Sequence, residues 1–273
     1  MTTFWEGVLS LSAASRTEPP RWPNGPSETP FDNNGHGTHV AGTLSGSHGI
    51  GIAPGADWIT CKAFDSSGRA SETHLLMCGE WMGCPTRWNG SGADCELGAQ
   101  VLSNSWGFSC GGCTGEGDPV ARMAEAWRAL GIYVTFAAGN SGPGCGTATS
   151  PADLADVLSV GGTDFHDNIA QWSSKGPPVD PEMPFGRQKP EIVAPGSGIR
   201  SAGRQTDTTY TSMSGTSMAA PQVAGGAALI LSATGASLGS EFLTMLLQSN
   251  ADYATLSPDR SCDGLPDTQI PNW

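Results

Sequence analysis

The chain has 273 residues, a formal net charge of −13 and a hydrophobic content of 38%. This length and composition allow one large hydrophobic core and do not indicate disorder, so we expect a single domain. Because only 13 residues are Lys or Arg, the chain lacks the clustered positive charge that nucleic acids and anionic membranes bind, and we expect neither as a partner. No apolar run approaches the about 20 residues needed to span a bilayer, so we expect no membrane insertion.

Strands and helices are predicted to alternate along most of the chain. Residues 12–34 are polar and predict a surface loop, and residues 252–273 predict a polar tail held by a disulfide. Helices are predicted at residues 36–45, 71–82 and 119–130 and onward from Gly215. Strands are predicted at residues 57–64, 99–106, 132–137, 157–161, 191–194 and 209–213. This alternation predicts an α/β fold of three layers, with a mostly parallel central sheet and helices on both faces.

The cysteines are an even number spread over loops, which favours disulfide bonds formed in an oxidising compartment. They are Cys61, Cys78, Cys84, Cys95, Cys110, Cys113, Cys145 and Cys262. Their pairing stays open, since eight cysteines allow about 105 arrangements. The C-x2-C spacing of Cys110 and Cys113 leaves structural zinc as the alternative, but no second pair follows at zinc-finger distance. A glycosylation sequon at Asn89 fits a secreted protein.

Two further features bear on cofactors and on secretion. The acidic composition could supply carboxylates for structural calcium, but no complete loop of alternating Asp ligands is present, so we expect no cofactor and assign no calcium site. The first 15 residues contain a short apolar patch from Val8 to Leu11, but they carry Glu6 and no basic region, so they make a poor signal peptide.

The candidate nucleophile is Ser217, which stands between glycine and a long apolar run where a loop turns into a helix. In this position a serine exposes its hydroxyl group, and the helix N-terminus directs backbone N–H groups at a reacting atom beside it. A serine needs a base that takes its proton and a donor for the oxyanion. His36, at the start of a predicted helix, supplies the base, and Asn140, at the end of a predicted strand, supplies an amide donor. These residue types together are what peptide-bond hydrolysis through an acyl-enzyme requires.

Four motifs in order resemble those of the subtilisin-like serine proteases, the subtilases, and among them most closely the bacillopeptidase F branch. They are residues 36–42 (HGTHVAG), 103–107 (SNSWG), 137–142 (AAGNSG) and 215–221 (GTSMAAP). Residues 51–64 and 189–196 also look like the family, so the resemblance runs from about Phe31 to a helix near Ser240. It implies the subtilisin-like fold and a secreted serine endopeptidase, a monomer that acts on protein or peptide substrates.

The resemblance also implies roles for individual residues. His36 becomes the general base, Ser217 the nucleophile and Asn140 the oxyanion donor. An extended substrate would lie between two walls of the main specificity pocket. Small residues in these walls would leave room for a large side chain, so we expect a broad preference for apolar or aromatic residues. The wall residues are Ser103, Asn104, Ser105, Trp106, Gly107, Ala137, Ala138 and Gly139.

One part of the family pattern is absent from the sequence. The aspartate that orients the histidine stands in an Asp-Ser/Thr-Gly turn before the histidine motif, and residues 1–35 contain no such triplet. Their only aspartate is Asp32, where relatives carry a structural acid, while Asp57 and Asp65 fit a strand start and a turn. We therefore expect residues 1–273 to form a single subtilase-type peptidase domain without its N-terminal aspartate strand, its signal peptide and its last C-terminal segment.

This departure leaves two hypotheses. The first is an active secreted serine endopeptidase, and the second is a catalytically impaired fragment or pseudoprotease that acts as a binding module. Loss of the orienting aspartate costs about 10⁴ in turnover in serine proteases. His39 stands three residues after His36, but no acidic or third histidine ligand accompanies them, so we expect His39 to be a buried, hydrogen-bonded helix residue rather than a metal ligand.

Overall fold

The computed structural model describes residues 8–11, 31–87, 90–108, 118–154, 157–177, 188–235, 238–252, 261–262 and 265–266. The helices are α1 (His36–Ser45), α2 (Glu72–Gly83), α3 (Pro119–Ala129), α4 (Thr216–Thr234) and α5 (Ser240–Ser249), with a 3-10 turn at Cys95–Leu97. The strands are β1 (Val8–Leu11), β2 (Trp58–Cys61), β3 (Val101–Asn104), β4 (Tyr133–Ala137), β5 (Leu158–Thr163), β6 (Ile192–Pro195), β7 (Ile199–Ala202), β8 (Tyr210–Met213), β9 (Ser261–Cys262) and β10 (Leu265–Pro266). Most of the predicted loop and tail lies outside the described residues, as do Asn89, Cys110 and Cys113.

The central sheet has six strands in the order β2-β1-β3-β4-β5-β6. Strands β3 to β6 are parallel to their neighbours, with Val101 opposite Tyr133 and Val160 opposite Ile192. Strand β1 lies between β2 and β3 and is antiparallel to both. The predicted mostly parallel sheet is confirmed. Strand β1 was not predicted, because the short apolar patch from Val8 to Leu11 has no alternation that would distinguish a strand from another apolar segment.

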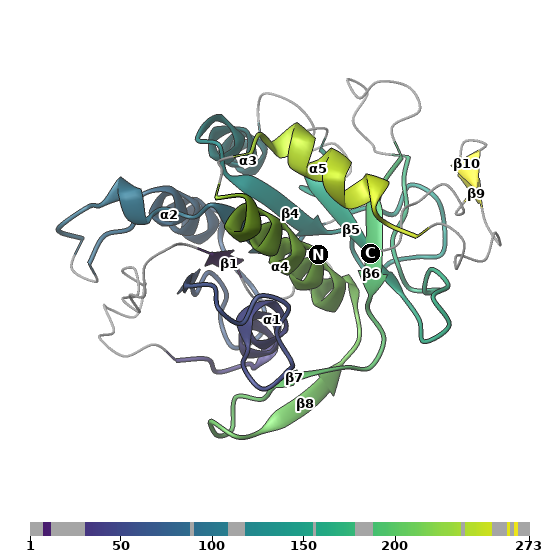
Figure 1. Ribbon diagram of the computed structural model, residues 1–273, viewed down its shortest axis with the longest axis horizontal. Coiled ribbons are helices and arrows are strands. Elements are labelled where there is room, and N and C mark those ends of the chain that lie inside the picture. The colour runs from purple at the N-terminus through teal and green to yellow at the C-terminus, as the bar shows by residue number, and fades with distance from the viewer. Residues whose placement is uncertain are drawn as a thin grey trace.

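Helices cover both faces of this sheet, as predicted, and form a hydrophobic core on each side (Figure 1). Helices α2 and α3 cover one face, where Leu102 and Val134 lie in their core. Helices α1, α4 and α5 cover the other face, where Val101 and Tyr133 lie. Successive residues of β3 and β4 therefore point into different cores, as the pleat of a strand requires.

Helix α4 runs through the second core, and its sequence explains its place. Residues 216–234 contain no Lys, Arg, Asp or Glu, and the helix is buried from Thr216 to Ala227. A helix that is apolar all round is stable only when protein covers it on every side. The first turn of α4, which carries Ser217, is consequently held from several directions.

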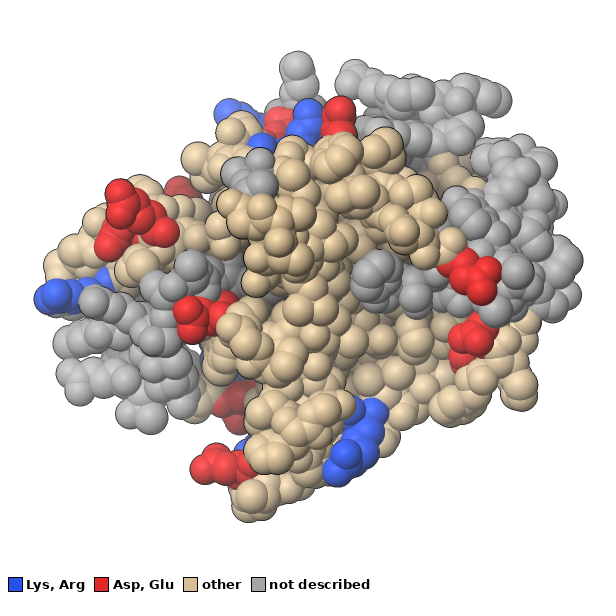
Figure 2. Space-filling model, in the orientation of Figure 1, with Lys and Arg blue, Asp and Glu red and all other residues tan. Residues whose placement is uncertain are grey.

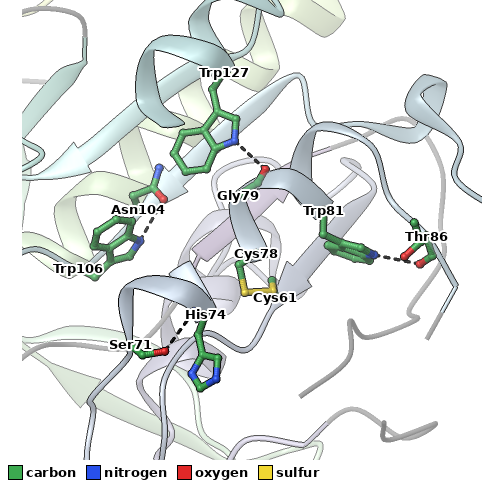
Figure 3. Close-up of a disulfide and its surroundings, with 10 residues drawn as sticks. All are labelled: Cys61, Ser71, His74, Cys78, Gly79, Trp81, Thr86, Asn104, Trp106 and Trp127. Carbon is green, nitrogen blue, oxygen red and sulfur yellow. Dashed lines mark hydrogen bonds between the residues drawn. A yellow bond between two sulfur atoms is a disulfide. The ribbon is translucent and has the colours of Figure 1, made fainter. Parts of the chain in front are cut away.

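Disulfide bonds, which the sequence predicts without a pairing, join six of the cysteines. Cys61–Cys78 ties β2 to α2 in the first core (Figure 3), Cys84–Cys95 closes a loop, and Cys145–Cys262 attaches the tail that contains β9. Around the first of these bonds, the indole N–H of Trp127 donates to the Gly79 carbonyl oxygen at 2.9 Å, and that of Trp81 donates to the Thr86 carbonyl oxygen at 3.0 Å. The predicted attachment of the tail by a disulfide is confirmed.

Element bounds differ from the predictions in two informative places. The predicted strand at 57–64 ends at Cys61, although Ala63 and Phe64 stay buried in the first core. An apolar run can be predicted as strand because its residues are buried, even where the chain has already left the sheet. Strand β7 was not predicted, because its partly exposed residues include Arg200 and carry no apolar pattern; it pairs with β8 in a separate antiparallel hairpin.

Candidate active site

The loop before α4 presents Ser217 as the second residue of the helix. Gly215 precedes it with φ +153°, in the region that favours glycine, and a Cβ atom at Gly215 would lie 3.3 Å from the side-chain nitrogen of Asn140. The backbone N–H groups in the first turn of a helix have no partner within the helix, and that of Ser217 is one of them. Glycine thus lets the Asn140 amide approach the helix N-terminus closely.

The carbonyl oxygen of Ser217 receives its hydrogen bond from outside the helix. In a regular helix the N–H four residues later would donate to it, but that residue is Pro221, which has no N–H group. The Ser105 hydroxyl donates to this carbonyl oxygen instead, at 2.9 Å. The proline of the motif therefore couples the nucleophile's backbone to the segment after β3.

Asn140 follows the carboxyl end of β4, and its side-chain oxygen is fixed by α4. Asn140 Oδ1 accepts hydrogen bonds from the Thr216 N–H at 2.9 Å and from the Thr216 hydroxyl at 3.1 Å, while Thr216 Oγ1 accepts from the Gly139 N–H at 3.1 Å. Because the oxygen of the amide is held by two donors, its NH₂ group is the part that can donate to a ligand. This is the arrangement that an oxyanion donor needs.

His36 is the first residue of α1, which packs along α4, and it is buried, with 2% of its surface exposed. The Ser217 hydroxyl donates to the carbonyl oxygen of Ser105 at 3.4 Å. At this length the bond is weak, so the hydroxyl group is readily released to another acceptor. The structure thus packs the helix that carries the candidate base against the helix that carries the candidate nucleophile.

His39 is a structural residue of α1, as predicted from the sequence. It is fully buried, and its Nε2 atom lies 2.9 Å from the Ile199 carbonyl oxygen of β7. Burial lowers the pKa of His39 below its usual value, although hydrogen bonds with the Ile199 and Thr211 backbones act in the opposite direction. A neutral ring at this position ties α1 to the β7–β8 hairpin.

The carboxylate of Asp32 is engaged at the start of α1. Its Oδ1 atom accepts from the backbone N–H groups of Asn34 at 2.9 Å and Gly35 at 2.8 Å, and its Oδ2 atom accepts from the N–H and hydroxyl of Thr38 at 3.0 and 2.6 Å. Burial by itself raises the pKa of Asp32, but these four hydrogen bonds outweigh it, so the pKa lies below its usual value. The geometry supports the structural role that the sequence suggests for this acid.

The two predicted substrate walls meet at the residue Thr149, which the sequence did not single out. A Cβ atom at Gly107 would lie 2.5 Å from Thr149 Oγ1, and one at Gly139 would lie 2.9 Å from Thr149 Cγ2. The Thr149 N–H also donates to the Ala138 carbonyl oxygen at 3.0 Å. Thr149 therefore lies beside both walls.

The remaining wall side chains are directed into the protein. Asn104 and Trp106 are 0% and 2% exposed; the Trp106 indole N–H donates to Asn104 Oδ1 at 3.1 Å (Figure 3), and the Trp106 ring packs edge-on against Phe136. Ser103 and Ala138 are also fully buried. Of residues 103–107, only Gly107 is not buried.

Sequence reasoning missed three residues near this site: Thr216, Thr149 and Ser174. Thr216 lies inside a motif and could have been found from its hydroxyl group beside the nucleophile. Thr149 and Ser174 lie in segments without a motif, and only the fold brings them to the site.

Among the described residues, no three or more His, Cys, Asp or Glu side chains gather as they would around a metal ion. None of the described helices has the length and apolar character to cross a bilayer.

Comparison with known proteins agrees with this geometry. Residues 11–264 match the model of the subtilase family. The chain is 37% identical over 247 residues to bacillopeptidase F of Bacillus subtilis, covering 86% of this chain and 16% of that protein, and 37% identical over 229 residues to the serine protease AprX of the same organism, covering 74% and 49%. It therefore spans at most about half the length of these two relatives.

A solved structure of a cold-adapted subtilisin-like serine proteinase superposes with a TM-score of 0.68 at 30% identity, covering 89% of this chain and 77% of that one. Sphericase superposes with a TM-score of 0.65 at 28% identity, covering 82% and 72%. These likenesses bear out the predicted subtilisin-like α/β fold. With a family match over most of its length, this chain belongs to the subtilase family.

Proposed function

We propose that the chain is a serine endopeptidase that hydrolyses peptide bonds through an acyl-enzyme on Ser217. The observation that carries the proposal is the convergence of Asn140 on the N-terminus of α4, where Thr216 holds its amide oxygen and leaves its NH₂ group free to donate. The names of the related proteins, which include serine and alkaline proteases, support the same activity.

The proposed reaction follows from these positions. Ser217 Oγ attacks the carbonyl carbon of the scissile bond while its proton passes to His36. The negative charge that develops on the carbonyl oxygen is stabilised by the Asn140 NH₂ group and the Ser217 N–H. His36 then gives its proton to the leaving amine as the C–N bond breaks, and a water molecule releases the acyl group by the reverse sequence.

The substrate class that we propose is narrower than the one expected from the sequence. Because Thr149 lies against both Gly107 and Gly139, we propose that the pocket between the walls takes small apolar side chains in preference to aromatic ones. The substrates would be extended protein or peptide segments, and the enzyme would act as a monomer without a cofactor.

We also propose that the protein works outside the cell. Three disulfides among the described cysteines fit an oxidising environment. On the face drawn in Figure 2, the described Lys and Arg side chains lie in separate groups.

The second candidate function is that of a catalytically impaired relative that binds peptides. It is favoured by the Asp32 carboxylate, whose oxygens are engaged by the loop before α1 and its first turn, and by the Ser217 hydroxyl, which donates to Ser105. In that case turnover would be about 10⁴ below that of a complete triad, while the peptide-binding backbone would remain.

A fluorophosphonate probe, which phosphonylates activated serine hydroxyls, tests the two functions directly. We expect it to label Ser217 in the full chain, as located by mass spectrometry of the digested protein. S217A should remove the label, and H36A should slow it by at least about 10²-fold, since general-base catalysis contributes that much. An unlabelled wild-type chain that is folded by circular dichroism would reject the endopeptidase and leave the binding function.

A further inference from the structure

Residues 172–175 lie along the turn that carries Asn140 and bond to it on both sides of that residue. The Ser174 N–H donates to the Gly139 carbonyl oxygen at 3.0 Å. The Ser141 N–H donates to Ser174 Oγ at 3.0 Å. One buried serine thus holds the residue before Asn140 with its backbone and the residue after it with its side chain.

The position of the Ser174 hydroxyl is itself narrowly defined. Ser174 is completely buried, and a Cβ atom at Gly139 would lie 2.9 Å from Ser174 Oγ. Gly139 has φ +108°, so the hydroxyl fits against a turn that only glycine adopts readily. Because it is packed this closely, the Ser174 hydroxyl group has little freedom to move. The turn that bonds to it is correspondingly restricted.

From these contacts we propose that Ser174 is a positioning residue that fixes the backbone of the oxyanion donor Asn140. The proposal rests on the proposed role of Asn140. Thr216 fixes the side-chain oxygen of Asn140 and binds the main chain on one side of it, at the Gly139 N–H, whereas the Ser141 N–H on the other side donates to Ser174. Ser174 supplies this second constraint, and the two together set both the place and the direction of the NH₂ group.

The expected effect on catalysis depends on how much transition-state stabilisation is lost when an oxyanion donor is displaced. Losing one oxyanion donor costs about 10²- to 10³-fold in kcat, and a misplacement of about 1 Å can cost up to about 10²-fold. Without the Ser174 hydroxyl, Asn140 keeps its amide but loses one anchor of its turn. We therefore expect an intermediate loss in S174A, of about 10-fold in kcat with KM nearly unchanged.

Ser173 provides a matched control. It is also completely buried, and its hydroxyl oxygen also accepts one backbone N–H, that of Gly162 at 3.1 Å. That N–H belongs to β5, so S173A removes the same kind of hydrogen bond without touching the Asn140 turn. We expect S173A to match S174A in loss of thermal stability and to keep the wild-type kcat.

A double-mutant cycle separates positioning from general structural damage. If Ser174 acts through Asn140, S174A should lower kcat in the wild-type background and have less than a twofold effect in the N140A background. S174T, which keeps the hydroxyl group, should recover most of the lost kcat. Equal losses from S174A in both backgrounds would overturn the proposal.

A readout without turnover keeps this proposal distinct from the proposed function. Amide hydrogen exchange at Ser141, followed by NMR, should become at least about 10-fold faster in S174A and stay unchanged in S173A. If N140A leaves the labelling of Ser217 unaffected, the proposed role of Asn140 fails, whereas unchanged Ser141 exchange in S174A rejects the Ser174 contact itself.

Discussion

The side chain of Thr149 lies beside both predicted substrate walls. Its hydroxyl lies against Gly107 and its methyl group against Gly139. In an apolar pocket one methylene group changes specificity by about 10- to 200-fold, so a residue in this place strongly affects which side chain is accepted. The sequence prediction of a wide pocket rests on the small wall residues alone and takes no account of Thr149.

We expect T149G to raise the ratio of kcat/KM for phenylalanine over alanine at the cleaved residue by at least about 10-fold, because removal of the side chain opens the space between the walls. Peptides that differ only in this residue provide the measurement. T149V, which keeps the volume and loses the hydroxyl, should retain the wild-type ratio. Equal ratios in T149G and the wild type would show that Thr149 does not limit the pocket.

At the scale of single residues, the candidate nucleophile, base and oxyanion donor could be predicted because each stands in a short local motif. Ser217 has Gly215 two residues before it and Pro221 four residues after it. Both residues constrain the backbone in ways that the sequence shows. Thr149 and Ser174 could not be predicted, because their importance comes from contacts with Gly139, which is 10 and 35 positions away in the chain.

Helix α1 shows how one carboxylate supports an element that carries a candidate catalytic residue. Asp32 accepts from three backbone N–H groups around the first turn of α1, where negative charge also interacts favourably with the helix dipole. These contacts fix the entry of the chain into the helix that begins at His36. An acid four residues before the histidine thus acts on the helix and not on the imidazole ring.

We expect D32N to lower the free energy of unfolding by about 1 kcal/mol at neutral pH, as loss of a helix cap does. The pKa of Asp32 is lowered on folding, so its stabilisation is complete above the unfolded value of about 4 and is lost as the pH falls through the folded value. The wild-type and D32N stabilities should therefore converge in acid. Urea unfolding at several pH values measures this, and a constant difference down to pH 2 would contradict it.

At the scale of elements, the long helices and most strands of the sheet are predictable from the sequence, whereas the end residues of an element and the direction of a strand are not. Helix α3 matches its predicted bounds to within one residue, because Pro119 starts it and an apolar stripe runs along it. Strand β1 has no such signals, because only pairing with β2 and β3 defines it. The sequence therefore shows that a sheet exists but not that one interior strand runs against the others.

A buried ion pair stabilises the end of the sheet where β5 and β6 begin. This end lies opposite to the candidate active site. Lys189 Nζ lies 2.7 Å from Glu191 Oε1 and donates to the carbonyl oxygens of Leu154 and Val157 at 2.6 and 3.0 Å. Glu191 Oε2 accepts from the Ser159 N–H at 2.8 Å. These groups join the beginnings of β5 and β6, whereas Asn140 follows the other end of a neighbouring strand.

We expect K189M to lower the free energy of unfolding by about 3–5 kcal/mol, because it leaves a buried carboxylate without its cation. In an E191Q background the same change should cost about 0.5–3 kcal/mol less, which urea unfolding of all four proteins would measure. Equal costs in both backgrounds would show that the pair is not coupled. Labelling of Ser217 in the folded K189M protein should stay at the wild-type rate, because the pair lies at the far edge.

The Cys145–Cys262 disulfide closes a covalent loop of the chain that contains Ser217 and the whole of α4. Any single peptide bond cut between the two cysteines leaves both pieces attached to each other. A protease that nicks itself within this region would keep its full mass in electrophoresis without a reducing agent and would separate into fragments only after reduction. The fraction of the protein that separates into fragments only after reduction therefore measures how much of a sample has been cut while still behaving as one molecule.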